Sequence, residues 1–283
     1  MTPKVIKTIG EMRRLSRQWR REGQRIALVP TMGFLHEGHL SLIRRARKAA
    51  DKTVVSIYVN PTQFAPGEDL DKYPRDFERD LKLCAEEKAD AVFFPENHEM
   101  YPPGYQTYVF NEHLSDKLCG QTRPTHFKGV TTIVAKLFNI VEADAAVFGQ
   151  KDAQQALIIR NMARDLNFRT NIIVAPIVRE NDGLAMSSRN KYLTPDQRKQ
   201  ALVLNKSLRY AEKQWQEGLR DMARLKADIY TMISARNACR VDYISFVDAC
   251  TLEEADSRSP EILLALAVFV GTTRLIDNVL LRR

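Results

Sequence analysis

The sequence predicts an α/β fold, in which a Rossmann-like parallel sheet with helices on both faces precedes a smaller C-terminal α+β domain. Two observations lead to this prediction. Up to about residue 178, short apolar runs alternate with helical stretches, and this alternation is typical of a parallel sheet. After residue 190 the order changes to helices followed by strands. We therefore expect one domain over residues 1–180 and a smaller one over residues 181–283.

The predicted strands of the first domain are short, apolar and rich in β-branched residues. The run Ile26-Ala-Leu-Val-Pro30 is the clearest, because it is apolar and ends in proline. Four more strands are expected on similar grounds, at residues 54–59, 91–94, 145–148 and 171–178. Helices are expected between them at residues 38–50, 75–88, 129–142 and 152–166, with Asp152 suited to cap the last one. Residues 95–126 are expected to be irregular.

The predicted second domain begins with a long helix over residues 195–217, for which Pro195 suits the first turn. A second helix is expected over residues 222–235, and strands over residues 241–247, 262–270 and 275–281. The run over 262–270 is the longest apolar stretch of the chain, and it is well short of the roughly 18 residues of a membrane span. It therefore indicates a buried strand, and no membrane partner is expected.

The charge of the chain is unevenly placed. The formal net charge is +8, with 43 Lys and Arg against 35 Asp and Glu, and a basic protein raises nucleic acid as a partner. Residues 1–25 hold eight of the bases and only two acids, and Arg282 and Arg283 supply the remaining excess. The body of the chain between them is balanced, so no nucleic acid partner is expected.

The basic N-terminal segment has the spacing of an amphipathic helix. Its apolar residues recur at three- and four-residue intervals, at Ile9, Met12, Leu15 and Trp19. The segment lacks the apolar core of a secretory signal. A solvated face on a globular body is the simplest interpretation, while contact with a membrane or RNA stays open as an alternative.

The cysteines indicate a reducing environment. The chain has four, Cys84, Cys119, Cys239 and Cys250, and none of them forms a Cys-x-x-Cys pair. Neither a zinc ribbon nor a thioredoxin motif is therefore indicated. Reduced thiols in a cytoplasmic protein are the simplest expectation.

The most informative segment runs from Pro30 to His39, with the sequence Pro-Thr-Met-Gly-Phe-Leu-His-Glu-Gly-His. It joins a predicted strand to a predicted helix, where open parallel sheets bind ligands and where a helix start favours anions. His36 and His39 are three residues apart, so they can share one face and donate hydrogen bonds to a phosphate. Two histidines of a surface loop, or a zinc site whose third ligand is not evident, are the alternatives.

Three further segments carry polar groups that could bind ligands. Gln63, in the Asn-Pro-Thr-Gln-Phe loop, suits a hydroxy acid, although an exposed loop glutamine would look the same. After the fourth expected strand, Lys151 offers a point charge for phosphate, and Asp152 could cap the helix or hold a ribose. Met-Ser-Ser-Arg, ending at Arg189, combines two hydroxyls with a guanidinium. Together these segments indicate ATP chemistry at an α/β crevice.

The segments occur in an order that resembles the pantothenate synthetase (pantoate–β-alanine ligase) family of the HIGH-type nucleotidyltransferase superfamily. The resemblance spans essentially the whole chain and rests on residues 30–39, 60–64, 73–75, 126–130, 148–155 and 179–190. It implies ATP-dependent ligation of (R)-pantoate and β-alanine to pantothenate, through pantoyl adenylate, with release of AMP and pyrophosphate. The alternatives are another adenylyl- or cytidylyltransferase of that superfamily and, more remotely, an RNA-binding protein.

The resemblance also assigns roles to residues. It implies catalytic roles for His36, His39, Lys151 and Arg189, with His39 as proton donor, and pantoate binding by Gln63 and Gln155, with Gln63 also near β-alanine. The implied ATP-binding residues are Met32, Gly33, Phe34, Leu35, His36, Glu37, Gly38, His39, Gly149, Gln150, Lys151, Asp152, Val178, Met186, Ser187, Ser188 and Arg189. Mg²⁺ is expected to accompany ATP, bound mainly through phosphate oxygens, with Asp80 as a protein partner. A homodimer is expected, as is closure of the smaller domain over the nucleotide-binding domain.

Overall fold

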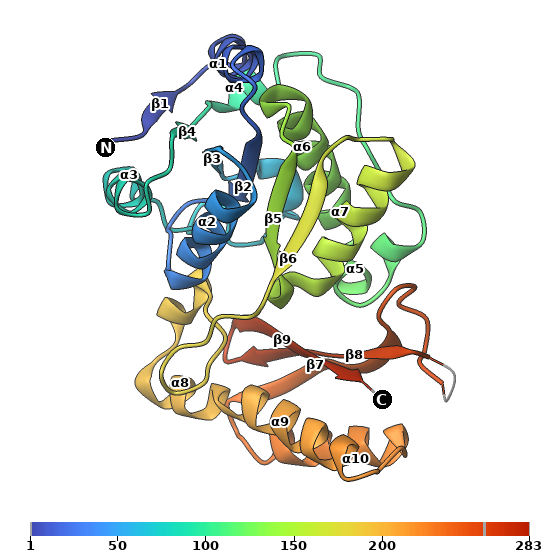
Figure 1. The fold of residues 1–283 in the computed structure, drawn as a ribbon. Coiled ribbons are helices and arrows are strands. Elements are labelled where there is room, and N and C mark those ends of the chain that lie inside the picture. Colours follow the sequence, from blue (N-terminus) through green and yellow to red (C-terminus); the bar gives the residue numbers. More distant parts are fainter. Residues whose placement is uncertain (1, 257–258, 283) are drawn as a thin grey trace. The chain divides into compact units, whose positions relative to one another are not determined.

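The strands of the first part of the chain form one parallel sheet, as predicted. The computed structural model describes residues 2–256 and 259–282, so Arg283 of the basic C-terminal pair lies outside the described residues. The sheet has six strands in the order β1-β4-β3-β2-β5-β6 (Figure 1). The strands are β1 Lys4–Ile6, β2 Ile26–Thr31, β3 Lys52–Ile57, β4 Ala91–Phe93, β5 Ala145–Gly149 and β6 Asn171–Ala175.

The order of the strands reverses at β2. The chain continues from β2 to β3 on one side, whereas β5 pairs with β2 on the other. Where the order of an open parallel sheet reverses, the connections leave the carboxyl ends of the two strands in opposite directions, and a crevice for a ligand results. The segments after β2 and β5 are therefore the ones that this topology marks for binding.

Helices cover both faces of the sheet because side chains alternate along the strands. Ile26 and Leu28 of β2 face the core that contains α1, α6 and α7, while Ala27 and Val29 face the core that contains α2 and α3 (Figure 1). The helices are α1 Ile9–Arg21, α2 Glu37–Ala49, α3 Phe77–Glu86, α4 Asn97–Met100, α5 Cys119–Thr122, α6 His126–Val141 and α7 Ala153–Asp165, with 3₁₀ turns η1 Pro61–Gln63, η2 Leu114–Asp116 and η3 Gln150–Asp152.

The basic N-terminal segment forms α1, and it packs on the body of the protein. Thr8 caps the helix by accepting the backbone N–H of Glu11 at 3.2 Å, while Met12 and Trp19 are buried. Arg20 lies 3.6 Å from Glu142 and 3.1 Å from Asp144, so acids that follow α6 offset part of its charge. The simplest interpretation of this segment, a solvated face on a globular body, agrees with this packing.

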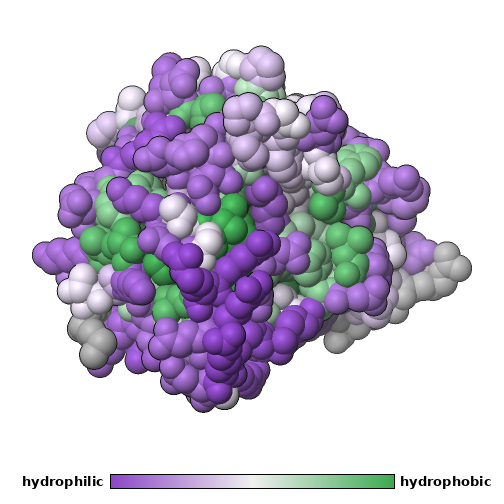
Figure 2. Space-filling model, turned by 90° about the horizontal axis from the view of Figure 1, so that it is seen from above, coloured by the Kyte–Doolittle hydropathy of each residue, from purple (hydrophilic) through white to green (hydrophobic). Residues whose placement is uncertain are grey.

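Figure 2 shows one face of the molecule, on which hydrophilic side chains prevail around smaller hydrophobic areas.

The remaining part of the chain forms an antiparallel sheet in the order β7-β8-β9, with three helices against it. The strands are β7 Cys239–Asp248, β8 Glu261–Val270 and β9 Thr273–Arg282, and the helices are α8 Pro195–Ala201, α9 Val203–Gln216 and α10 Met222–Ser234, preceded by the 3₁₀ turn η4 Ser188–Tyr192. The core of this sheet holds buried residues such as Leu204, Trp215, Ile229 and Leu264. The predicted α+β architecture is confirmed.

The chain divides into two compact units. The first contains residues up to Asp116, Gly120–Gln150 and Gln154–Pro176, and the second contains Lys117–Cys119, Lys151–Ala153 and the chain from Ile177 onward. Lys151–Ala153 therefore group with the second unit although they follow a strand of the first. No helix within residues 2–256 and 259–282 combines the length and apolarity that a membrane span requires.

Two local predictions are wrong. The helix expected over residues 195–217 is two helices, α8 and α9, which separate at Leu202. Neither Gly nor Pro marks this break, and it arises in packing, since α8 contacts β8 while α9 also contacts β9. The region expected to be irregular contains α4, η2 and α5. Strand β1 was not expected, because three residues show no periodicity, and its pairing with β4 defines it.

The two-sided core makes a prediction about stability. Leu28 lies at the centre of β2 with 0% exposure, whereas Leu166 is 50% exposed. We expect Leu28→Ala to lower the free energy of unfolding by about 2–5 kcal/mol, because it removes buried methyl groups and leaves a cavity. The matched Leu166→Ala should change it by no more than about 0.5 kcal/mol. Urea unfolding of both variants measures the difference, and equal effects would contradict the assignment of the core.

Candidate active site

A buried carboxylate shapes the loop between β2 and α2. Asp80, from α3, is 1% exposed, and its two oxygens accept the backbone N–H groups of Phe34 and Leu35 at 2.6 and 2.7 Å. Burial raises the pKa of Asp80, although these two N–H groups oppose the shift. Gly33 has φ +80°, and a Cβ there would lie 3.0 Å from Asp80 Oδ2. The loop thus needs both the glycine and the carboxylate to hold its shape.

The loop delivers both predicted histidines to the start of α2. His36 is the residue before the helix, and His39 lies in its first turn. Their ring centroids are 4.0 Å apart, and the backbone N–H of His36 donates to Nδ1 of His39 at 3.3 Å. Because Nδ1 accepts, the neutral ring of His39 carries its proton on Nε2. The pair therefore offers hydrogen-bond donors where the helix start attracts anions.

Gln63 is held by a network of polar side chains in η1. The Asn60 amide nitrogen donates to Gln63 Oε1 at 3.1 Å, and Gln63 Nε2 donates to the sulfur of Met32 at 3.0 Å. Asn60 is oriented in turn, because its oxygen accepts from Thr62 and Tyr101, each at 2.9 Å. Burial raises the pKa of Tyr101 to about 12, so its phenol keeps the proton that it donates. The amide of Gln63 retains one N–H and one lone pair for a ligand.

The backbone around Gln63 is fixed by residues near the start of α6. The carbonyl of Gln63 lies 2.9 Å from His126 Nδ1 and accepts from Arg123 at 3.2 Å. Arg123 also binds Glu68 through two bonds of 2.7 and 2.6 Å. Burial would raise the pKa of Glu68, but the guanidinium overcomes this and the pKa lies below its ordinary value. The segment over residues 60–72 is therefore tied to the start of α6 by a largely buried ion pair.

The predicted phosphate-binding stretch 186–189 leaves a tight hairpin in the second unit. Arg179 pairs with Ala185 across it, and the backbone N–H of Met186 donates to the carbonyl of Val178 at 3.0 Å. Ser187 then accepts the N–H of Arg189 at 3.2 Å and starts η4. A carbonyl oxygen has two lone pairs, so this bond leaves Val178 able to accept from a second donor.

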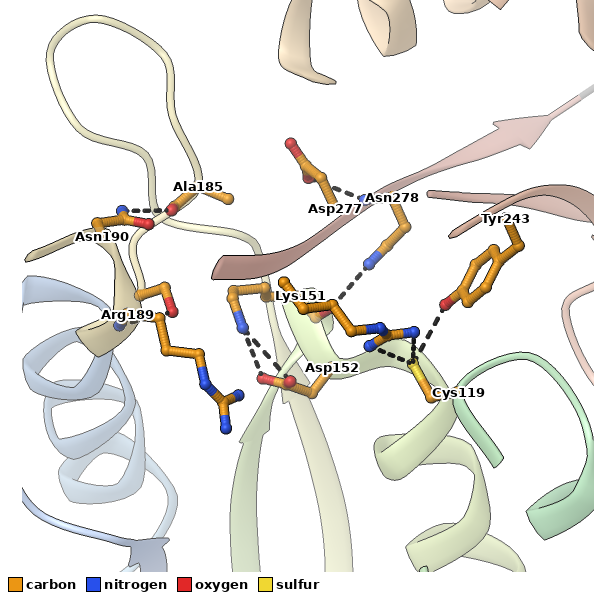
Figure 3. A network of polar contacts seen from close by, with 11 residues as sticks. Cys119, Lys151, Asp152, Ala185, Arg189, Asn190, Tyr243, Asp277 and Asn278 are labelled. Carbon is orange, nitrogen blue, oxygen red and sulfur yellow. Dashed lines mark hydrogen bonds and ion pairs between the residues drawn. The ribbon is translucent and has the colours of Figure 1, made fainter. Parts of the chain in front are cut away.

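Lys151 and Asp152 lie in the same unit as this hairpin. The Lys151 ammonium is 3.4 Å from both oxygens of Asp152. Figure 3 shows Arg189 extending toward the side on which these two residues lie. The second unit thus carries these two cationic side chains on different segments, and Ser187 and Ser188 directly precede Arg189.

The remaining predicted residues lie where the sequence expects them along the chain. Glu37 and Gly38 begin α2, Gly149 ends β5, Gln150 begins η3, and Gln155 lies in the first turn of α7. The neighbouring Gln154 serves the fold, since it is buried and donates to the carbonyl of Leu114 at 2.8 Å.

Several residues that hold Gln63 and the η1 turn in place were not candidates in the sequence. Tyr101 orients Asn60, which binds Gln63, while Arg123 binds the Gln63 carbonyl and Glu68 holds Arg123. No motif marks any of these three residues. The glycine of His-Phe-Lys-Gly-Val was a signal, because a Cβ at Gly129 would lie 2.4 Å from the Thr62 carbonyl oxygen. Only a glycine lets α6 approach η1 so closely.

The described side chains offer little evidence for a metal site made by the protein alone. Within the described ranges, no group of three or more His, Cys, Asp or Glu residues is placed to hold one. Asp80 directs its oxygens at backbone N–H groups, so its geometry suits a loop anchor better than a metal ligand. The predicted metal role of Asp80 stays a prediction.

The reversal of strands at β2, beside a helix start that attracts anions, defines the first unit as a doubly wound α/β fold, a class of proteins that bind ligands at this switch point. Comparison with known proteins is more specific. The chain belongs to the pantoate-beta-alanine ligase family, whose model matches residues 4–280. It is therefore an enzyme of the ligase type, as the resemblance implied.

Individual relatives agree with this family. The chain is 52% identical to a pantothenate synthetase from Thermotoga petrophila over 278 residues, which cover 98% of this chain and 99% of that one. It is 53% identical over 277 residues to one from Acetivibrio thermocellus, with 98% and 99% covered.

Solved structures give the same result. Pantothenate synthetase from Thermus thermophilus superposes with a TM-score of 0.93 at 40% identity, covering 99% of this chain and 100% of that one. A ligase from Francisella tularensis, solved in complex with beta-gamma ATP and beta-alanine, gives a TM-score of 0.81 at 32% identity, with 98% and 97% covered. These structures share the predicted fold over both sheets.

The role of Asp80 as a loop anchor can be tested with Asp80→Asn. The amide has one acceptor oxygen, so its NH₂ group would face one of the two loop N–H groups. We expect a loss of about 1–3 kcal/mol in unfolding free energy and weaker ATP binding. The matched control is Asp76→Asn, because Asp76 caps the same helix and asparagine caps equally well. Chemical unfolding and ATP titration measure both, and an Asp80→Asn protein that behaves like the control would contradict the anchor.

Proposed function

We propose that this chain ligates (R)-pantoate to β-alanine at the expense of ATP. A carboxylate oxygen of pantoate bonds to the α-phosphorus while the bond to the β-phosphate oxygen breaks, which gives pantoyl adenylate and pyrophosphate. The β-alanine amine then bonds to the acyl carbon, loses a proton and displaces AMP. The observation that carries this proposal is the family match over residues 4–280. The complex of the Francisella tularensis ligase supports ATP and β-alanine as ligands.

The residues of the first unit supply donors for charge that develops during adenylation. We assign Met32–His39 to ATP, with His36 and His39 near its phosphates and His39 as proton donor. The Nε2–H tautomer, which follows from its bond with His36, supports this role. Gln63 and Gln155 are assigned to pantoate, and Gln63 also to β-alanine. The rigid network around Gln63 supports a positioning function, because aligned reactants need little reorganisation.

The residues of the second unit supply positive charge. We assign Lys151 and Arg189 to the ATP phosphates. Asp152, Ser187, Ser188 and the backbone of Val178 and Met186 are assigned to ATP as well, as are Gly149 and Gln150 of the first unit. Phosphoryl transfer requires neutralisation more than covalent chemistry, and two cations beside serine hydroxyls suit it.

Three further assignments complete the proposal. Mg²⁺ would accompany ATP and would be held mainly by phosphate oxygens and water, as this ion prefers. We also propose that the chain forms a homodimer, which its mass in solution would reveal. A cytoplasmic location accords with four cysteines that form no disulfide.

The reaction predicts a strict requirement for substrates. We expect AMP to form only with ATP, Mg²⁺, pantoate and β-alanine together. Exchange of pyrophosphate into ATP should need pantoate but not β-alanine, because adenylation precedes amide formation. Both assays use the purified full chain, with EDTA as the test of the metal. Folded protein without either activity would refute the proposal.

Two substitutions test the assigned roles. We expect His39→Ala and Lys151→Ala to fold normally and to slow pyrophosphate exchange by about 10²–10³-fold, because each removes a donor to the transition state. Matched controls are His98→Ala and Lys213→Ala, whose side chains are exposed. Single-turnover rates separate chemistry from binding. Wild-type rates in either variant would remove that residue from the mechanism.

A further inference from the structure

Two adjacent buried polar residues in the middle of β9 were not candidates in the sequence. Asp277 is 2% exposed and Asn278 is 4% exposed. Burying a carboxylate and an amide is costly unless their hydrogen bonds are made. Asp277 makes hydrogen bonds with the hairpin that leads to residues 186–189, and Asn278 makes one with Lys151, and both of these segments carry residues assigned to ATP. The inference that follows therefore rests on the proposed function.

Asp277 holds the hairpin that leads to residues 186–189. Arg179 donates to its two oxygens at 2.7 and 3.0 Å, a bidentate arrangement that fixes both partners. The same guanidinium donates to the carbonyl of Gly183 at 3.2 Å. Asp277 thereby fixes both the base and the tip of the hairpin through one arginine.

Asn278 holds the segment that carries Lys151. Its side-chain nitrogen donates to the carbonyl of Lys151 at 3.0 Å. Successive side chains of a strand point to opposite faces, so Asp277 and Asn278 reach different segments from neighbouring positions (Figure 3). The backbone N–H of Asn278 also donates to Asp277 Oδ1 at 2.8 Å. This bond links the residue that holds the hairpin to the residue that holds Lys151.

We propose that Asp277 and Asn278 are positioning residues for ATP, which hold Lys151 and the 186–189 stretch at a fixed spacing within the second unit. β9 is rigid, because it pairs with β8 along its whole length. Lys151 lies in a 3₁₀ turn of three residues, which has few internal bonds to fix it. An external bond to its carbonyl therefore determines where its side chain begins. Misplacing a phosphate-binding cation weakens both ATP binding and the transition state.

The test uses two variants of Asn278 in the full chain. Asn278→Ala removes the donor, and Asn278→Asp keeps the shape but places a carboxylate against the Lys151 carbonyl. We expect the KM for ATP in pyrophosphate exchange to rise at least tenfold in both, with the KM for pantoate within about twofold. Should one variant not fold, the other carries the test.

The control separates positioning from general stability. Tyr210→Phe removes a hydrogen bond of 2.8 Å to Asp228, which joins α9 to α10 in the same unit. It should lower the melting temperature without changing the KM for ATP. If an Asn278 variant and Tyr210→Phe lose the same amount of melting temperature but only the Asn278 variant has a raised KM for ATP, the result supports positioning.

A double-mutant cycle with Lys151→Ala identifies the route of the effect. If Asn278 acts through Lys151, the two substitutions together should raise the KM for ATP little more than Lys151→Ala alone. Fully additive effects would overturn the positioning role. An unchanged KM in the Asn278 variants, beside a raised one in Lys151→Ala, also overturns it but leaves the proposed function standing. An unchanged KM in all of them overturns the positioning role and the assignment of Lys151 to ATP, whereas the proposed function is overturned only if the unsubstituted protein shows no pyrophosphate exchange.

Discussion

The hydrogen bonds that pair β2 with β3 on one side and with β5 on the other set the architecture of the first unit. With parallel neighbours on both edges, β2 is buried on both faces, and its side chains must alternate between two helical layers. The same pairing sends the connections after β2 and β5 apart at one edge of the sheet. The loop after β2 then needs its own support, which Asp80 supplies to Phe34 and Leu35.

Several buried polar groups in this enzyme position other groups. Asp80, Asn60 and Asp277 each satisfy backbone or side-chain partners and leave the assigned ligand contacts to residues beside them. Such groups are costly when unpaired, so a network that satisfies all of them permits one arrangement and penalises others. This explains how a flexible type of residue, such as Gln63, is held in one orientation.

For charge, as for buried polar groups, the placement of individual residues matters more than their total number. The overall excess lies largely in residues 1–25, where Arg17 and Arg20 of α1 meet Glu142 and Asp144. Screening by salt and water reduces the reach of such exposed charges. The chemistry proposed here depends instead on individual cations, Lys151 and Arg189, whose placement matters more than the net charge of the chain.

Periodicity and motif order in the sequence were enough to predict the parallel sheet, the C-terminal α+β unit and the segments that follow β2, β3 and β5. These features depend on residues that are neighbours in the sequence, so apolar periodicity and motif order indicate them. The pairing of Tyr101 with Asn60, 41 residues apart, and of Arg179 with Asp277, 98 residues apart, leaves no such record. Nor does the break between α8 and α9. Tertiary packing alone decides these features, because each depends on partners that come together only when the chain is folded.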